Sequence, residues 1–257
     1  MKAPIMAHLV AGFPDNTRAL GIGTALLEGG ASFLEVQLPF SDPSADGPTI
    51  QAACQQALDG GFKVADGFQL VAQLRAAGDA PIYMMSYANL PFRRGVAEFL
   101  ARCQDSGATG VIVPDLPLDY DEGLYAESRR LGLEALPVVP VSAPLERLDK
   151  VVKLSQARSL YAALRAGVTG RQTRIDEVGL TFLRHIRSLG VRLLAGFGIS
   201  APEQVRHLAP EVDVLIVGSA FVREIQSAIQ RGIPEAPSVR DLMRRFAGAL
   251  DRTSDTA

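Results

Sequence analysis

The sequence of 257 residues contains no tryptophan, only two cysteines and no excess of positive charge. Cys54 and Cys103 lack CxxC spacing and are too few for a disulfide framework, so we expect a reducing compartment. The net charge is −2, with Arg and Glu interspersed, which argues against nucleic acid or an anionic membrane as partner. No run of about 20 apolar residues is present, and the amino-terminal run is too short and broken for a signal peptide. A cytoplasmic protein with a small-molecule or protein partner is therefore expected.

Lysine and histidine are also scarce. The few residues of these types are Lys2, Lys63, Lys150 and Lys153, and His8, His185 and His207. None of the lysines falls at the carboxyl end of an expected strand, which disfavours Schiff-base chemistry and covalent pyridoxal phosphate. The histidines show no metal-ligand spacing with each other or with the cysteines, so we expect no metal site. His8 is expected to pack beside the pocket and not to act as a base.

Short apolar runs alternate with amphipathic helical patterns eight times. The expected strands are Ile5 to Val10, Ser32 to Leu38, Pro81 to Tyr87, Gly110 to Asp115, Ala135 to Val141, Ser159 to Leu164, Arg192 to Gly198 and Asp213 to Ser219. The expected helices are Thr17 to Leu27 after the cap Asp15, Thr49 to Leu58, Val64 to Ala76, Val96 to Cys103, Tyr120 to Leu131, Leu145 to Leu154, Gly179 to Leu189, Pro202 to Leu208, Phe221 to Ile229 and, last, Val239 to Leu250.

This alternation predicts an α/β protein with parallel strands and helical crossovers. Eight units in about 250 residues is the size of a (β/α)8 TIM barrel. An open doubly wound sheet is the alternative, but the eight runs are similarly apolar, which favours closure. We expect one barrel domain over residues 1–250, including a linker over residues 231–238, and a polar tail over residues 251–257.

Two carboxylates lie in and just after the second expected strand. Because side chains alternate along a strand, Glu35 shares a face with Gln37 and opposes the apolar residues Leu34 and Val36. Asp46 follows in the loop, so both acids can open onto the carboxyl-terminal mouth of the barrel and do acid/base chemistry. The alternatives are a buried ion pair between Glu35 and an arginine, and an Asx turn at Asp46.

Glycine-rich turns follow the last three expected strands. They are RAGVTG at residues 165–170, GFGIS at 196–200 and GSA at 218–220. Glycines let backbone N–H groups approach an anion, and a helix start after the turn adds a positive dipole end. Ser200 and Glu203 predict a capping box at the start of the seventh helix. We expect a phosphate site here; GFGISA lacks the acidic residue of a dinucleotide fingerprint, and no GxxxxGK[ST] motif for ATP or GTP is present.

Taken together, these motifs resemble the alpha subunit of tryptophan synthase. The resemblance covers nearly the whole barrel, through AHLVAGFPD, LPFSDPSADGPTIQAA, MSYANL, VIVPDLP, LRAGVTG, AGFGIS and IVGSA in family-like order and spacing. It implies a lyase of tryptophan biosynthesis that cleaves indole-3-glycerol phosphate to indole and glyceraldehyde 3-phosphate by a retro-aldol reaction.

The resemblance also implies roles for individual residues. Glu35 matches the general acid/base of the family, and Asp46 matches the carboxylate that contacts the indole N–H. Tyr161 matches a pocket tyrosine, and Thr169 lies in the loop that closes over the substrate. The matches to the phosphate-binding positions are Gly170, Gly198, Gly218 and Ser219.

Two positions depart from the family pattern. Gln37 stands where most relatives have glycine, and we expect it to hydrogen-bond Glu35 or to narrow the pocket. Leu164 replaces the small polar residue usual before the family's arginine, here Arg165. Both departures bear on loop contacts and on coupling to a partner, and neither removes the expected reaction.

By the same resemblance, the partner is the tryptophan synthase beta subunit in an α2β2 heterotetramer. The chain itself then needs no cofactor, and pyridoxal phosphate is expected only in the beta subunit. The loop at Asp42 and Pro43 and exposed Leu90, Pro91 and Phe92 are expected to face that partner, with helix-entry packing as the alternative for the last three. Two other functions stay open: a different phosphate-sugar enzyme such as an isomerase, and a non-catalytic barrel that activates its partner.

Overall fold

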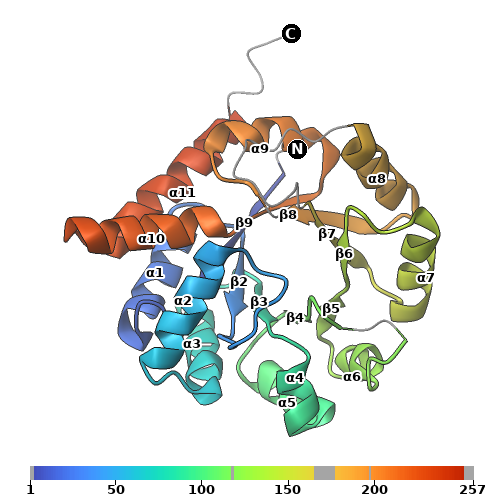
Figure 1. Cartoon of the computed structure of the whole chain (residues 1–257), viewed down its shortest axis with the longest axis horizontal. Helices are drawn as coiled ribbons and strands as arrows, with labels where there is room; N and C mark the ends of the chain where they lie inside the picture. Colours follow the sequence, from blue (N-terminus) through green and yellow to red (C-terminus); the bar gives the residue numbers. More distant parts are fainter. Residues whose placement is uncertain (1–2, 117–118, 165–176, 197, 252–257) are drawn as a thin grey trace.

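A computed structural model describes residues 3–116, 119–164, 177–196 and 198–251. Within them, parallel strands form a ring at the centre of the molecule and helices cover the outside of the ring (Figure 1). The fold is a single α/β domain of the TIM-barrel type, as the alternation of strands and helices predicts. The open doubly wound sheet is excluded.

The strand order runs β5, β4, β3, β2, β1, β9, β8, β7, β6, and neighbouring strands in the described part of the chain pair in parallel. The described strands are β1 (Ile5–Val10), β2 (Phe33–Gln37), β3 (Ile82–Met85), β4 (Gly110–Ile112), β5 (Glu134–Leu136), β6 (Val138–Pro140), β7 (Ser159–Ala163), β8 (Arg192–Gly196) and β9 (Val214–Val217). Only Pro137 separates β5 from β6, so these two strands are halves of one expected strand. β5 pairs with β4 and β6 pairs with β7, and Tyr161 N donates to Pro137 O at 2.9 Å, which closes the ring.

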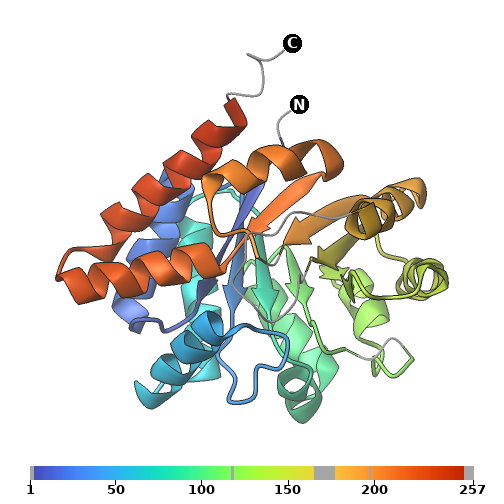
Figure 2. The same cartoon turned by 45° about the horizontal axis from the view of Figure 1, so that its top comes forward.

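The helices surround this ring in both views (Figure 2). They are α1 (Asn16–Glu28), α2 (Pro48–Asp59), α3 (Val64–Ala77), α4 (Asn89–Arg94), α5 (Val96–Asp105), α6 (Leu124–Arg130), α7 (Leu145–Ser155), α8 (Glu177–Ser188), α9 (Pro202–Leu208), α10 (Ser219–Arg231) and α11 (Glu235–Asp251), with a 3-10 turn at Ala209–Glu211. No helix in the described part of the chain is long and apolar enough to cross a membrane.

Some predicted boundaries are wrong. The helix expected from Tyr120 begins at Leu124, because Asp121 accepts hydrogen bonds from Gly123 N and Tyr125 N and because Gly123 has a φ of +82°. The expected linker over residues 231–238 is shorter, since α10 ends at Arg231 and α11 begins at Glu235. The predicted cap is confirmed: Asp15 accepts from Arg18 N at 2.8 Å.

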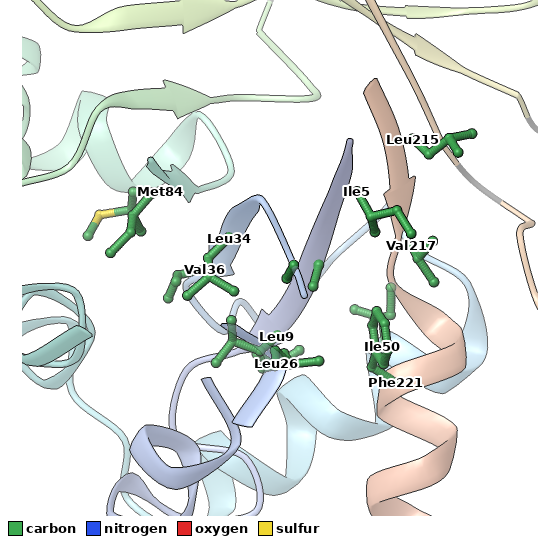
Figure 3. Packing of buried hydrophobic residues seen from close by; sticks show 14 of the residues in the cluster. Ile5, Leu9, Leu26, Leu34, Val36, Ile50, Met84, Leu215, Val217 and Phe221 are labelled. Carbon is green, nitrogen blue, oxygen red and sulfur yellow. The ribbon is translucent and has the colours of Figure 1, made fainter. Parts of the chain in front are cut away.

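Strand alternation creates two apolar cores. Outward residues such as Leu34 and Val36 of β2 pack against the helices, and Ile50 of α2 and Phe221 of α10 lie together outside the ring (Figure 3). Inward residues fill the lumen: Met6, Tyr83, Met85, Tyr87, Ile112, Leu136, Tyr161, Leu194, Val214 and Ile216. Each large apolar side chain buried in either core stabilises the fold by roughly 1.5–3 kcal/mol. Glu35 points into the lumen, so a charged group stands among these inward residues.

The last helix packs against the first. Arg18 of α1 forms an ion pair with Glu235 of α11 at 2.7 Å, and Arg240 of α11 pairs with Glu28 of α1 at 3.2 Å. α11 lies beside α10 in both views. The first and last helices thus lie on one side of the barrel, away from β7, which carries Tyr161 (Figure 1).

Candidate active site

The sequence-predicted site residues that the structure describes lie on or just after four strands of the ring. Tyr161 lies on β7, Gly198 follows β8, Gly218 and Ser219 follow β9, and Glu35 lies on β2. With β1 between β9 and β2, these strands form an uninterrupted arc of the sheet. Because parallel strands end at the same mouth, residues that are far apart in the sequence reach one place.

Glu35 is buried and has a histidine as its neighbour. Only 4% of Glu35 and 4% of His8 is exposed, and the two residues are directly opposite in the β1–β2 register. Nδ1 of His8 lies 3.5 Å from Oε2 of Glu35. The observed partner of Glu35 is therefore the imidazole of His8, and not the arginine of the alternative expectation. Such a pairing reduces the cost of placing a carboxylate in an apolar lumen.

The pKa of His8 is raised above its usual value. Burial alone disfavours the imidazolium and lowers the pKa, but the hydrogen bond to Glu35 and the charges of Glu35 and Asp46 outweigh burial. The protonated form of His8 is thus favoured to a higher pH than in an isolated histidine.

Asp46 is also buried, and its side chain is anchored from two strands. Oδ2 accepts hydrogen bonds from Gln37 Nε2 at 2.7 Å and from Tyr87 Oη at 2.8 Å, and 3% of the residue is exposed. Burial raises the pKa of Asp46, although His8, Gln37 and Tyr87 each favour the charged carboxylate. The Asx-turn alternative does not describe this side chain. Gln51 Nε2 donates to the backbone oxygen of Asp46 at 3.0 Å and ties the loop to α2.

The expectation that Gln37 hydrogen-bonds Glu35 is wrong. The amide of Gln37 donates to Asp46, and Nε2 also lies 3.5 Å from Sγ of Cys54. Residues two apart on one strand are separated by about 6–7 Å, while the loop after β2 folds Asp46 back over Gln37. Gln37 is fully buried, and within the described residues its Oε1 has no hydrogen-bond partner. Gln37 therefore positions the second acid instead of the first.

Tyr161 lies on β7 among the inward residues and is affected by both carboxylates. Its pKa is raised well above the usual value, first by burial and then by the charges of Glu35 and Asp46. The same two carboxylates act on His8. The charges of Glu35 and Asp46 therefore reach the same two buried side chains, Tyr161 and His8.

The expected phosphate-binding positions lie at neighbouring strand ends. Gly198 has a φ of +92°, which a residue with a side chain rarely adopts, and Gly218 immediately precedes α10, which begins at Ser219. The first N–H groups of a helix have no partner inside the helix and can bind an anion. Thr169 and Gly170 lie outside the described residues.

The predicted capping box of Ser200 and Glu203 is wrong. α9 begins at Pro202, and Gln204 supplies the acceptor: its Oε1 receives hydrogen bonds from Ser200 N at 2.6 Å and from Ala201 N at 2.9 Å. The predicted start of this helix at Pro202 is confirmed, and only the capping pair is shifted by one residue, from Ser200 and Glu203 to Ala201 and Gln204.

Sequence reasoning missed one residue of the site. Tyr87, two positions after β3, contacts Asp46 through its hydroxyl, and its ring stacks on Phe40 with centroids 5.3 Å apart. Its place just past a strand end was a usable signal. The expected exposure of Leu90, Pro91 and Phe92 is wrong: Pro91 is buried, and Leu90 and Phe92 are partly buried against the outer core in α4. These three residues instead pack at the start of a helix, which was the alternative to an exposed partner surface.

No group of three or more His, Cys, Asp or Glu side chains that could hold a metal ion occurs among the described residues. A cavity of about 500 Å³ lies at the amino ends of β5, β7 and β8, where Glu134 accepts from Tyr83 Oη at 2.6 Å and from Ser159 Oγ. This cavity is at the opposite end of the strands from Asp46.

Comparison with known proteins decides the family. The family model of the tryptophan synthase alpha chain matches residues 1–250. The chain belongs to the tryptophan synthase alpha chain family. The alpha chain of Helicobacter hepaticus is 36% identical over 231 residues, covering 87% of this chain and 86% of its own length. The alpha chain of Methanoregula boonei is 33% identical over 257 residues, covering 99% and 95%.

Solved structures of the family have the same fold. Tryptophan synthase of Mycobacterium tuberculosis superposes with a TM-score of 0.87 at 31% identity, covering 97% of this chain and 93% of that chain. The tryptophan synthase α2β2 complex of Pyrococcus furiosus gives a TM-score of 0.88 at 31% identity, covering 96% and 98%. As a member of this family, the chain is a lyase that carries out the indole-3-glycerol phosphate cleavage step of tryptophan biosynthesis.

Proposed function

We propose that Glu35 and Asp46 carry out this cleavage as an acid/base residue and a charge-stabilising residue. The single observation that supports the assignment most strongly is that two carboxylates, Glu35 on β2 and Asp46 in the loop after it, are both buried, with 4% and 3% of each residue exposed. A lone buried carboxylate is costly, so two of them in one lumen indicate a functional requirement.

The chemistry assigns a different task to each acid. Glu35 protonates C3 of the indole ring, which leaves positive charge near the ring nitrogen. Asp46, whose charged form the hydrogen bonds from Gln37 and Tyr87 favour, stabilises that charge. Glu35 then takes the proton of the adjacent glycerol hydroxyl, the carbon–carbon bond breaks, and its electron pair restores the indole ring. The products are indole and an aldehyde.

The phosphate end of the substrate is proposed to bind at the opposite side of the arc. Gly198 and the start of α10 at Gly218 and Ser219 offer backbone N–H groups, and Thr169 and Gly170 are proposed to join them. Tyr161 is proposed to line the pocket between the two ends of the substrate. No cofactor is assigned to this chain.

Replacement of Glu35 by Gln tests the assignment. Glu35→Gln is expected to lower kcat by about 10²–10⁴-fold, because a positioned proton-transfer group contributes this much, while substrate binding survives. Indole release from indole-3-glycerol phosphate measures kcat, and calorimetry with the substrate measures binding. Retained turnover would contradict the proposal.

Glu134→Gln is the matched control. It makes the same chemical change at a partly buried carboxylate at the other end of the strands. Near-wild-type turnover is expected for this variant. Absence of indole release by the wild-type chain with and without its beta chain would instead favour the non-catalytic alternative.

We also propose a tryptophan synthase beta chain as the partner in an α2β2 assembly, with pyridoxal phosphate confined to that partner. Solved relatives include such complexes. The loop at Asp42 and Pro43 lines a surface groove of about 590 Å³ together with Gln51, Ala52 and Gln55 of α2. Gln51 also donates a hydrogen bond to the backbone oxygen of Asp46, so one residue of this groove contacts the loop that carries the second acid. A cytoplasmic location and the division into a barrel over residues 1–250 and a polar tail over residues 251–257 stay predictions.

A further inference from the structure

The imidazole of His8 has no place in the mechanism described above, although it lies between the two ends of the site. β1, which carries His8, is the strand between β2 and β9. On one side Nδ1 lies 3.5 Å from Oε2 of Glu35. On the other side the ring lies against Gly218: a Cβ at that glycine would be 3.4 Å from Cγ and 3.6 Å from Cδ2 of His8.

The burial of His8 makes this placement informative. Its Nε2 is buried and has no hydrogen-bond partner within the described residues. An apolar side chain of the same shape would avoid leaving a buried nitrogen unpaired, so a histidine here has a cost. Among the described residues, the contact of Nδ1 with Glu35 offsets this cost.

We propose that His8 is a positioning residue that shares a proton with Glu35. In the free enzyme the proton resides on Nδ1 beside the Glu35 carboxylate. When substrate binds, this proton moves from Nδ1 to Oε2, and Glu35 passes it to C3 of indole. The hydroxyl proton that Glu35 takes in the cleavage step then returns to Nδ1. One proton is added to the indole ring and one is removed from the glycerol hydroxyl, so His8 and Glu35 return to their starting protonation states.

The charged groups around His8 favour this arrangement. Those that act on the imidazole are Glu35 from β2 and Asp46 from the following loop, and on the β9 side the neighbour is Gly218, which has no titratable group. Both charges favour the protonated ring, and they oppose the effect of burial. His8 therefore keeps a proton available to Glu35 at a pH at which an isolated carboxyl has lost its own.

The experiment is a pH profile of kcat/KM for wild type, His8→Asn and His8→Phe. Asn keeps a donor at the position of Nδ1 but cannot carry an extra proton, whereas Phe keeps the ring shape without a donor. We expect the alkaline limb to move to lower pH by about one unit or more in both variants, because Glu35 must then hold the proton alone. A His8→Asn profile that superimposes on wild type overturns the inference, because a hydrogen bond alone would then suffice.

A second measurement does not depend on whether the His8 variants fold. Nuclear magnetic resonance of ¹⁵N-labelled histidine follows the protonation of His8 in wild type and in Glu35→Gln. We expect the imidazole to titrate at lower pH in Glu35→Gln, because the carboxylate that stabilises the imidazolium is gone. Equal titration in the two proteins contradicts proton sharing.

The inference rests on the role proposed for Glu35, and the two can fail separately. Retained turnover in Glu35→Gln would remove the role of Glu35 itself. If Glu35→Gln loses turnover but the pH profile of His8→Asn is unshifted, Glu35 keeps its role as the acid/base residue. Only the role inferred for His8 would then be contradicted.

Discussion

At the scale of residues, the site depends on a few polar contacts within an apolar lumen. Asp46 receives two hydrogen bonds from side chains that belong to different strands, Gln37 on β2 and Tyr87 after β3. Donors directed at a carboxylate favour its charged form and hold it in one rotamer. The side chain of Asp46 is therefore fixed by the protein itself, as its proposed role of stabilising a positive indole ring requires.

Asp46→Asn tests this role. The substitution keeps the shape but removes the charge that faces the indole nitrogen, so kcat is expected to fall by about 10²–10³-fold. Tyr87→Phe removes only one hydrogen bond to the carboxylate and is expected to lower kcat by about tenfold. Steady-state indole release compares the two variants. A larger loss in Tyr87→Phe than in Asp46→Asn would show that the hydroxyl, and not the charge, is the essential group.

The pH dependence of stability is a second consequence at this scale. Folding raises the pKa of His8 above its ordinary value of 6.5, so the folded chain binds this proton more tightly than the unfolded chain. The contribution to stability is present in full below pH 6.5 and is lost as the pH rises through the raised value.

Urea unfolding of wild type and His8→Asn from about pH 6 to about pH 9 measures this contribution. The free energy of unfolding of wild type is expected to fall relative to the variant by at most about 1.4 kcal/mol per pH unit. Asp46, whose pKa is also raised, is present in both proteins, so the difference between the curves reports His8. Parallel curves would contradict the assignment.

Side-chain contacts were the features that the sequence predicted least well. Alternation along β2 placed Glu35 and Gln37 correctly on the inner face, because period two is a property of the strand itself. The partner of Gln37 was wrong, because it depends on how the loop carrying Asp46 folds back. His8 was predicted to pack beside the pocket, and its contact with Glu35 arises only from the β1–β2 register. These contacts are decided by tertiary structure.

At the scale of elements, the proposed phosphate end of the site consists of strand-to-helix turns. Gly198, in the turn after β8, has a positive φ, and α10 begins directly after Gly218. The glycine-rich turns were identified in the sequence at these positions, and the start of α9 at Pro202 was predicted correctly, while the start of α6 was displaced by four residues because the side chain of Asp121 decides its cap.

Gly198→Ala tests the phosphate turn, with Gly190→Ala as its control. Both glycines have positive φ, +92° and +71°, so both substitutions introduce similar backbone strain, but Gly190 lies between α8 and β8 at the other end of the strands. Gly198→Ala is expected to raise KM for indole-3-glycerol phosphate by about tenfold or more through displaced N–H groups. Gly190→Ala is expected to lose stability only. Equal KM values in the two variants would argue against a phosphate site at Gly198.

At the scale of the whole molecule, eight repeats of strand and helix were sufficient to predict a closed barrel. The alternation of apolar runs and amphipathic segments requires parallel strands, and no detail of packing is needed for that conclusion. The seam at Pro137, where one expected strand divides into β5 and β6, was not predictable, because it follows from how the last pair of strands must meet to close the ring.

The partner surface also belongs to this scale. Ala52 is exposed on α2 and lines the groove beside Asp42 and Pro43, so Ala52→Arg is expected to abolish binding of the beta chain from the same organism. A bulky desolvated charge in an interface is unfavourable by several kcal/mol, roughly 2–5. Sedimentation or size-exclusion chromatography of the mixed chains measures the complex.

Ala126→Arg on α6 is the matched control, because Ala126 is exposed on a helix that lies away from this groove. This variant is expected to form the complex normally. Normal assembly by Ala52→Arg would move the proposed interface away from the groove.

The ion pair between Arg18 of α1 and Glu235 of α11 joins positions 217 residues apart. During synthesis, α1 leaves the ribosome long before α11 exists, and at about 5–20 residues per second the delay is on the order of ten seconds or more. Throughout that time the surface of α1 that α11 covers is open to water and to other nascent chains. Packing of α11 onto α1 is therefore a late step of folding, and mutations in the last helix should affect yield in the cell more than activity of the protein that has already matured.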